Sequence, residues 1–427
     1  MTFPSMLRML YPLFAVAFFI AAAAPTCAVH EWTLPFDAVG VIEQKVDPAG
    51  NVYALLYSPP GGVEVKKFDT SGRLLWTSSA PDGSAKLDFD AAGDAYVIGQ
   101  PDVMTWPDTH DVVTMKYDPS GRPLWKARFR TDAGWHNGGS APVLAVDRAT
   151  GIVYVTISME KGFAEEGALV TIKYAADGHE EWVRRYRPGA ASVGGLSDDP
   201  LAVAPDGGAV VLAGTDLPDA DVLLRYDAQG SLLWMYREPD GTMGLLTVGP
   251  DGAVYVGSWS GVSKYAPTGQ LLWTAPCRVS RLQVDGAGGV YVTEDTWAPG
   301  LITRKYGPSG EQLWSAQYVA PDGVKARPSA LTLDASASAY VTILLEEEAV
   351  DPNMPYLPGG WLYREVALVT VKYDANGTQQ WLAIHDPPPQ YGPPIEDVAV
   401  DAQGRVYVLA GGIVIKYAQV EYGQPGG

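Results

Sequence analysis

Residues 116–125 read KYDPSGRPLW, and this ten-residue stretch decides the fold because the chain repeats it. The stretch joins a basic and an aromatic residue to an Asp, a turn ending in Gly, and an apolar pair closed by Trp. Repetition at this scale indicates a repeat architecture, so the fold follows from counting copies. The six further copies are KFDTSGRLLW at 67–76, KYAADGHEEW at 173–182, RYDAQGSLLW at 225–234, KYAPTGQLLW at 264–273, KYGPSGEQLW at 305–314 and KYDANGTQQW at 372–381.

A second motif, of the form V-D-x-x-G-x-x-Y-V, alternates with the first. In both motifs Asp can accept hydrogen bonds from the turn backbone and Gly supplies a positive φ, so both have structural reasons to recur. The eight copies of the second motif lie at 46–53, 89–97, 146–155, 203–211, 248–256, 284–292, 333–341 and 400–408.

The unequal counts of the two motifs predict how the repeats close. Lys416-Tyr417 begins an eighth copy of the first motif, but no Gly or Trp follows in its pattern. Trp32 lies 15 residues before Asp47, close to the spacing that Trp76 keeps from Asp90. Trp32 therefore supplies the missing tail, and we expect the N-terminal strand to complete the last repeat.

Each repeat divides into four strands, a to d, with alternating apolar residues and short turns typical of antiparallel pairs. Eight four-stranded sheets that close on themselves predict an all-β, eight-bladed β-propeller. A seven-bladed ring is the alternative if one repeat is degenerate. We expect the Trp at the end of each strand d to wedge between neighbouring blades.

Residues 1–28 are predicted to be a signal peptide, followed by the propeller at 29–418 and a C-terminal tail at 419–427. Arg8 precedes an apolar run at 11–24, and small residues at 25–28 form a cleavage region. The run is too short to span a bilayer as a helix. A lipoprotein attached at Cys27 is the alternative. Cleavage after residue 28 leaves Cys277 alone, which excludes an internal disulfide and a cysteine metal site.

The formal net charge of −19 over 427 residues argues against nucleic acid as a partner, because phosphate binding needs clustered Lys and Arg. The balance suits a secreted, periplasmic or cell-envelope protein.

The segments LVTIKYAADGHEEW at 169–182 and LVTVKYDANGTQQW at 368–381 resemble the bacterial β-propeller repeats called SBBP. Those repeats read YVTG followed by T-x-K-Y-D-x-x-G-x-x-x-W. The resemblance covers nearly all of the chain after residue 28. It implies a secreted or envelope protein of a bacterium and a scaffold without an activity of its own.

A looser resemblance is to the tryptophan-docked propellers of pyrroloquinoline quinone dehydrogenases and of an outer-membrane assembly lipoprotein. The dehydrogenases carry a vicinal cysteine disulfide, for which a mature chain with Cys277 alone has no counterpart. Sialidases share a similar aspartate turn, but their arginine triad has no evident counterpart, since Arg184, Arg185 and Arg187 are scattered along one segment.

Alternating strand directions place all a–b and c–d turns on one face, here the turn face. The b–c and d–a connections form the opposite face, here the variable face. Spacing between repeat tryptophans varies from 39 to 67 residues, and the excess falls in the variable face. Loops carry binding residues more often than scaffold turns do. The candidate ligand-binding residues there are the five tryptophans outside the repeat, Trp106, Trp135, Trp259, Trp297 and Trp361, with His110, His136 and His385.

An alternative for each of these tryptophans is that it pins its own loop to the propeller rim. The longest loop is predicted at 346–364, as a flap over the channel mouth, an edge contact with a partner, or a mobile excursion.

The sequence carries few motifs of catalytic or metal-binding sites. No calcium-loop, zinc or nucleophile motif is present, so no cofactor is expected, with calcium in the channel or under a loop as the exception. Six strand-a ends carry Asp, and the basic residue of strand c recurs in every repeat, which predicts an internal ring of Lys–Asp pairs rather than a ligand ring.

The leading hypothesis is a monomeric scaffold that binds a glycan, peptide or protein through the variable face. The alternative is a carbohydrate-active hydrolase or lyase at the channel mouth. An enzyme should bring two carboxylates, or a His and a carboxylate, together there.

Overall fold

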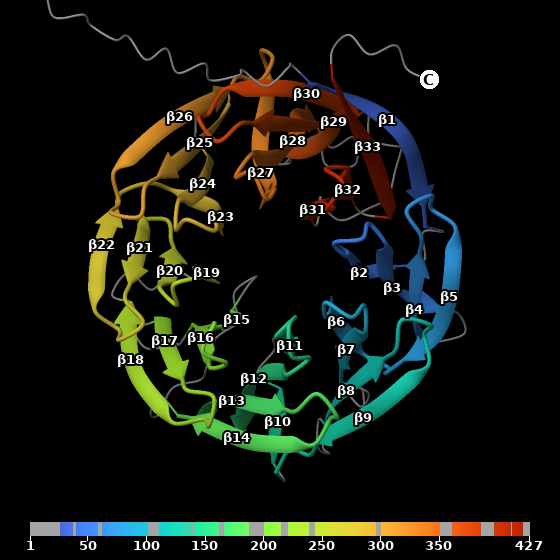
Figure 1. The fold of residues 1–427 in the computed structure, drawn as a ribbon, viewed down its shortest axis with the longest axis vertical. Helices are drawn as coiled ribbons and strands as arrows, with labels where there is room; N and C mark the ends of the chain where they lie inside the picture. Colours follow the sequence, from blue (N-terminus) through green and yellow to red (C-terminus); the bar gives the residue numbers. More distant parts are fainter. Residues whose placement is uncertain are drawn as a thin grey trace, which may run out of the picture.

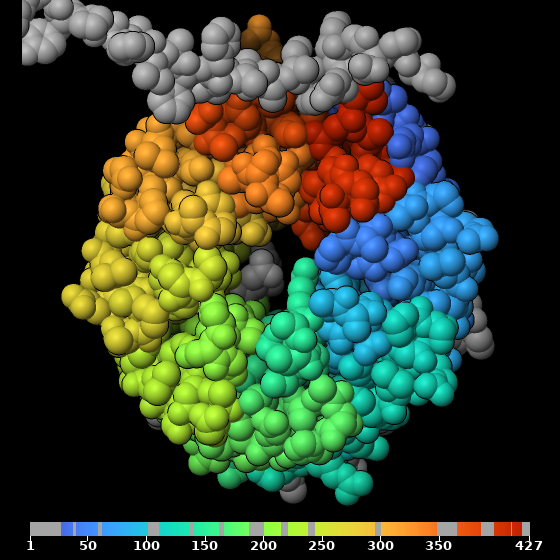
Figure 2. All heavy atoms as spheres, viewed as in Figure 1, coloured from blue at the N-terminus to red at the C-terminus, as the bar shows by residue number. Residues whose placement is uncertain are grey.

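The computed structural model describes residues 26–36, 40–58, 62–100, 111–132, 134–137, 141–161, 166–187, 200–214, 221–238, 244–295, 300–350, 361–385, 397–410 and 412–421. Regular structure in these ranges consists of strands, which pair into eight antiparallel sheets. Figure 1 shows the sheets arranged in a ring, and Figure 2 shows them as wedges around a central opening. The predicted eight-bladed β-propeller is confirmed, so the seven-bladed alternative is wrong.

Each blade runs from strand a at the channel to strand d at the rim (Figure 1). Blades 1 to 4 are formed by β2 (Val41–Val46), β3 (Val52–Ser58), β4 (Gly62–Phe68) and β5 (Leu74–Ala80); β6 (Ser84–Phe89), β7 (Ala95–Gly99), β8 (Val112–Tyr117) and β9 (Pro123–Phe129); β11 (Val143–Val146), β12 (Val153–Lys161), β13 (Glu166–Tyr174) and β14 (Glu180–Tyr186); and β15 (Leu201–Val203), β16 (Ala209–Ala213), β17 (Asp221–Tyr226) and β18 (Leu232–Glu238). Blade 3 also contains β10 (Trp135–Asn137), which pairs with the end of β12.

Blades 5 to 8 follow the same order. They are formed by β19 (Leu245–Val248), β20 (Val254–Gly257), β21 (Val262–Tyr265) and β22 (Leu271–Ala275); β23 (Val279–Val284), β24 (Val290–Asp295), β25 (Leu301–Tyr306) and β26 (Gln312–Tyr318); β27 (Val324–Leu333), β28 (Ala339–Val350), β29 (Trp361–Tyr373) and β30 (Gln379–His385); and β31 (Asp397–Val400), β32 (Val406–Ala410), β33 (Ile413–Glu421) and β1 (Thr26–Pro35).

The N-terminal strand closes the ring, as the motif count predicts. β1 pairs antiparallel with β33, and Trp32 lies opposite Lys416. Trp76 lies opposite Lys67 in blade 1 in the same register. Both ends of the described chain therefore share one blade, which removes the open sheet edge that an unclosed ring would leave.

The repeat tryptophan joins each blade to the next. It is the third residue of a typical strand d rather than the last, and its indole N–H donates to a carbonyl in the next blade's c–d turn, as Trp76 does to Pro119 at 2.9 Å. The turn glycine lies beneath the ring: a Cβ on Gly121 would come within 2.6 Å of Trp76. Gly121 also has φ +86°, where side chains are disfavoured. The motif glycine thus serves both the turn and the docking of the preceding blade.

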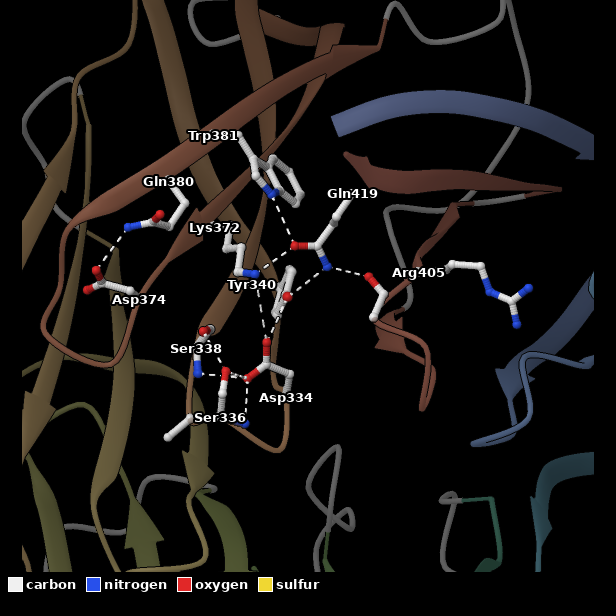
Figure 3. Close-up of polar contacts among 12 residues, drawn as sticks. Asp334, Ser336, Ser338, Tyr340, Lys372, Asp374, Gln380, Trp381, Arg405 and Gln419 are labelled. Atoms are coloured by element: carbon white, nitrogen blue, oxygen red, sulfur yellow. Dashed lines mark hydrogen bonds and ion pairs between the residues drawn. The ribbon is translucent and has the colours of Figure 1, made fainter. Parts of the chain in front are cut away.

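Blade 8 has no covalent c–d turn, and Gln419 of β33 supplies the missing acceptor (Figure 3). The side-chain oxygen of Gln419 accepts from Lys372 at 2.6 Å and from the Trp381 indole at 3.4 Å. Its amide nitrogen donates to the Tyr340 hydroxyl at 3.0 Å and to the Gly404 carbonyl. A side chain therefore replaces the turn backbone at the junction of blades 7 and 8.

The predicted internal ring of Lys–Asp pairs is present on the turn-face side in five blades, and two blades use other partners. In blade 1 the ammonium of Lys67 instead lies over the Tyr53 ring, 4.8 Å from its centre, and Asp47 accepts from Asn51. Lys173 pairs with Glu181, because Asp147 in the longer turn of blade 3 accepts from the Thr150 hydroxyl instead. Lys416 pairs with Glu31, because Asp401 binds Arg405. The predicted type of partner is found for Lys116 with Asp90 and Asp94, Arg225 with Asp206, Lys264 with Asp251, Lys305 with Asp285 and Lys372 with Asp334.

Within the part of the chain that the structure describes, no helix has the length and hydropathy needed to cross a membrane.

Candidate functional site

The candidate aromatic residues of the variable face have different surroundings. Trp106, Trp297 and His110 lie outside the described residues. The backbone places Trp361 first in β29, paired with Val350, and His136 in β10, paired with Glu160.

Trp135 anchors its own segment. It begins β10, packs on the core between blades 2 and 3, and has the guanidinium of Arg187 5.3 Å from its ring centre. The alternative that the Trp pins its own loop holds for this residue, although β10 is a strand where a loop is predicted. The segment at 135–137, Trp-His-Asn, can extend the sheet because β12 continues past its partner β11.

Two further positions expected in loops lie in strands. Part of the predicted loop at 346–364 is strand, because β28 continues to Val350 and β29 begins at Trp361, paired residue by residue. The rest of that range, 351–360, lies outside the described residues. His385 is the last residue of β30, and its ring stacks on that of His30 with centroids 6.1 Å apart.

Among the candidate residues whose side chains the structure describes, Trp259 is the exposed one. It is 66% exposed and lies in the b–c connection of blade 5. Beside it is a cavity of about 370 Å³ lined by Arg278, Arg281 and Arg327, with Ser258 and Ser280 among its other lining residues. We call this the arginine–tryptophan cleft. It gathers the b–c connection of blade 5, the connection into blade 6, and the innermost strands of blades 6 and 7.

A tight turn presents Trp259 to solvent. The Ser258 amide donates to the Gly261 carbonyl at 2.8 Å, and the Ser258 hydroxyl hydrogen-bonds the Ser260 hydroxyl at 2.9 Å. The Val279 amide donates to the Ser258 carbonyl at 3.0 Å, which ties the turn to blade 6. The ring therefore projects from a fixed backbone, with the guanidinium of Arg278 4.7 Å from its centre.

Arg281 is held in position by backbone carbonyls. Its Nε donates to the Ser329 carbonyl at 2.6 Å and its Nη1 to the Ser280 carbonyl at 2.7 Å. The bond to Ser329 crosses from β23 to β27, which Figure 1 shows next to each other on the inner side of the ring. A bulge in β23 at Ser280 and another in β27 at Ser329 interrupt the regular register here. Bulges redirect side chains, so the irregular register helps direct Arg281 and Arg327 of these two strands toward the cleft.

Arg327 contributes an exposed guanidinium. Its Nη1 lies 3.3 Å from the Glu346 carboxylate, and its side chain is 61% exposed. Glu346 is itself buried at 8%. A single-contact ion pair with one exposed partner leaves the remaining donors of the planar guanidinium directed to solvent or to a ligand.

The innermost strands on the other side of the channel have matched charges. Lys86 of β6 lies 3.4 Å from Glu43 of β2, and Lys45 of β2 lies 3.7 Å from Asp88 of β6. Opposite charges therefore alternate between blades 1 and 2, whereas the cleft gathers three arginines.

One pair of carboxylates lies next to the cleft. Glu346 and Glu365 are direct cross-strand partners in β28 and β29. Burial and the negative charge of Glu346 raise the pKa of Glu365 above its usual range. Glu365 can therefore hold a proton closer to neutral pH than a free glutamate does.

The arginines weighed from the sequence lie elsewhere. Arg184, Arg185 and Arg187 are at the outer rim in and after β14, where they contact the Gly230 carbonyl, Asp132 and Glu166 respectively. The cleft arginines are missed by sequence reasoning because Arg281 and Arg327 lie in different blades. The available signal is that the first strands of repeats 6 and 7 carry arginines where those of repeats 3 to 5 are apolar or neutral.

Reactive and metal-binding groups are sparse in the described ranges. Burial raises the pKa of the Cys277 thiol to about 11, which suppresses its thiolate at neutral pH. No group of three or more His, Cys, Asp or Glu side chains among the described residues is arranged to hold a metal ion.

Comparisons with known proteins show the fold. The sequence matches no family model and no curated protein. Among solved structures, the WD40 domain of SCAP from fission yeast is 8% identical with a TM-score of 0.52, covering 92% of this chain and 98% of that one. The Dos1 propeller is 10% identical with a TM-score of 0.49, covering 92% and 95%. A streptogramin B lyase structure is 12% identical with a TM-score of 0.46, covering 91% and 98%. The likeness to the SCAP domain shows that the chain has the fold of a β-propeller.

Proposed function

We propose that this propeller is a binding scaffold whose variable face takes a ligand in the arginine–tryptophan cleft. The observation that carries the proposal is the cavity of about 370 Å³ beside Trp259. Its volume is in the range of about 300 to 1,000 Å³ usual for small-ligand sites. A fixed, exposed indole and several guanidinium groups are the residue types most enriched where binding energy concentrates.

The turn face is a poorer candidate. Its aspartates accept hydrogen bonds from their own turns, as Asp118 does from the Ser120 and Arg122 amides. Its tryptophans donate to the neighbouring blade. These polar groups are used by the scaffold, so the variable face is where a ligand gains new contacts.

Glycan and peptide arrays test this function with the wild-type chain and two variants. Trp259→Ala should lose the signal of the bound class, whereas Trp135→Ala, which removes a packed ring, should keep it when corrected for the folded fraction. Equal binding by wild type and Trp259→Ala to every bound probe would remove the cleft from the account.

A catalytic role is the second candidate, because Glu346 and Glu365 are partners beside the cleft and the pKa of Glu365 is raised. The pair would act on a glycoside held by the cleft, with protonated Glu365 as the acid. Release of reducing ends from an array-positive glycan, abolished in Glu365→Gln, would support a hydrolase. Intact ligand after prolonged incubation with wild type would leave binding alone.

Export to the periplasm or cell exterior of a bacterium, as an SBBP-type repeat protein, is part of the same proposal. It rests on residues 1–28 and on the repeat consensus. Fractionation of cells that express the full chain, with N-terminal sequencing of the product, tests it. A cytoplasmic product that keeps Met1 would contradict it.

A further inference from the structure

In the cleft, Arg281 and Arg327 share one carboxylate contact between them. The chain carries a formal net charge of −19, yet both guanidinium groups line one cavity, where Arg281 bonds to backbone carbonyls and Arg327 lies 3.3 Å from Glu346. Grouping like charges costs electrostatic free energy unless anions offset it. Two arginines with one carboxylate beside an open cavity, in a strongly acidic protein, have the charge of an anion site.

The arginines also have the geometry for a planar anion. Guanidinium groups bind carboxylates and related oxyanions through parallel N–H donors, which Lys cannot do. The bonds from Arg281 to the Ser329 and Ser280 carbonyls fix its orientation before any ligand arrives. Arg327 reaches in from the neighbouring strand with an exposed head. A preorganised guanidinium on one blade and an exposed one on the next can together hold one anionic group.

The rest of the lining favours a sugar over a peptide. The lining is mainly arginine, serine and the exposed ring of Trp259; Val279 is buried, and Leu245 and Pro328 are half-buried. An extended peptide is recognised through an open strand edge and apolar side-chain pockets. A hydroxylated ring needs polar partners and one aromatic face, which the arginines, Ser280 and Trp259 supply.

We infer that the arginine–tryptophan cleft binds an acidic carbohydrate. The sugar ring lies on Trp259, and its carboxylate or sulfate is bound by Arg281 and Arg327. This inference rests on the proposed function and adds the ligand's chemical class to it.

Matched probes test the charge requirement. The probes are oligogalacturonate, the same oligosaccharide with its carboxylates methyl-esterified, a sulfated oligosaccharide with its desulfated form, and poly-glutamate. Binding to the full chain is measured by isothermal titration calorimetry at low and high salt. At least one acidic oligosaccharide should bind, about tenfold or more tighter than its neutral form, and high salt should reduce that difference. The carboxylate and sulfate arms identify which anionic group the cleft takes.

Variants then assign the effect to the cleft. Arg327→Gln should weaken the acidic probe about tenfold or more and leave the neutral probe unchanged. Its urea midpoint is measured as well, because the change leaves the buried Glu346 without its cation. Arg122→Gln removes an exposed arginine on the turn face and should change neither. Arg281→Gln is measured together with its urea midpoint, since this residue also joins two blades.

The possible results separate the inference from the function on which it rests. Equal binding of acidic and neutral sugars, with loss in Trp259→Ala but not in Arg327→Gln, would overturn the acidic ligand and keep the cleft. Binding of poly-glutamate without any acidic oligosaccharide would overturn the carbohydrate class. Absence of binding by every glycan and peptide would overturn the proposed function itself.

Discussion

Alanine at a docked turn glycine should destabilise the propeller more than alanine at an undocked one. Gly178, in the c–d turn of blade 3, has φ +89°, and a Cβ there would come within 2.5 Å of Trp125. Gly72, in the equivalent turn of blade 1, has φ +80°, but the nearest atom of Trp32 would be 3.8 Å away. The two glycines have similar backbone conformations, and they differ in how close the tryptophan ring of the preceding blade lies to an added Cβ.

The expected magnitudes follow from that difference. Gly72→Ala should cost about 1 to 2 kcal/mol, because alanine is strained in the left-handed region. Gly178→Ala has the same strain and must also displace the Trp125 ring, which adds about 1 to 3 kcal/mol of overpacking. Displacement also loosens the bond from the Trp125 indole to the Ala176 carbonyl, 2.9 Å long. Gly178→Ala should therefore cost about 2 to 5 kcal/mol in total.

Urea unfolding followed by tryptophan fluorescence measures both variants. Gly207→Ala is a further control, because its φ is +76° and the nearest atom to an added Cβ is 3.7 Å away in Ala228. Equal losses in all three variants would show that backbone strain alone explains the recurring glycine. The docking of tryptophans on turns would then have no part in its selection.

Three further predictions concern stability and reactivity. Lys116→Met leaves the buried carboxylates of Asp90 and Asp94 without their cation, at 3.6 and 2.8 Å, and should cost about 3 to 5 kcal/mol in urea unfolding without changing ligand affinity; loss of a ligand at unchanged stability would instead make the Lys–Asp ring a binding site. A hydrogen bond from the Ser120 hydroxyl, with help from the Arg122 amide, lowers the pKa of Asp118 to about 2. A lowered pKa in the folded state adds stability that is present above the ordinary value of 3.8 and is lost as the pH falls toward 2. Wild type should therefore lose more stability than Asp118→Asn between about pH 5 and about pH 2.5. Parallel losses in the two proteins would count against this role. Cys277 should react with a thiol reagent at pH 8 far more slowly in the native than in the urea-unfolded chain, since burial raises its pKa to about 11, and equally fast labelling would contradict its packing.

The propeller could be predicted from the sequence because its repeat is local. Asp, Gly and Trp at fixed offsets specify a turn, its φ and a docking ring within ten residues. Ring closure could be predicted for the same reason, since Trp32 and Lys416 are halves of one motif and lie opposite each other in β1 and β33. Local rules repeated eight times leave few other arrangements.

The candidate site could be predicted only in part because it is not local. Trp259 stands out as a tryptophan outside the repeat, and it does lie in an exposed turn. Arg281 and Arg327 meet only because neighbouring blades place their innermost strands together, and no periodic signal relates them. The sequence at 346–364 predicts a loop because it contains three glutamates and three prolines, yet residues 346–350 and 361–364 extend β28 and β29, and β27 pairs with β28 as far as Glu347.

Backbone hydrogen–deuterium exchange with the tightest array-positive ligand tests the location of binding most directly. The account predicts that protection appears at the Ser258–Gly261 turn, at residues 278–281 and around Arg327, while the c–d turns such as 118–122 are unchanged. Protection confined to the c–d turns, with none around Trp259, would contradict the assignment of function to the arginine–tryptophan cleft.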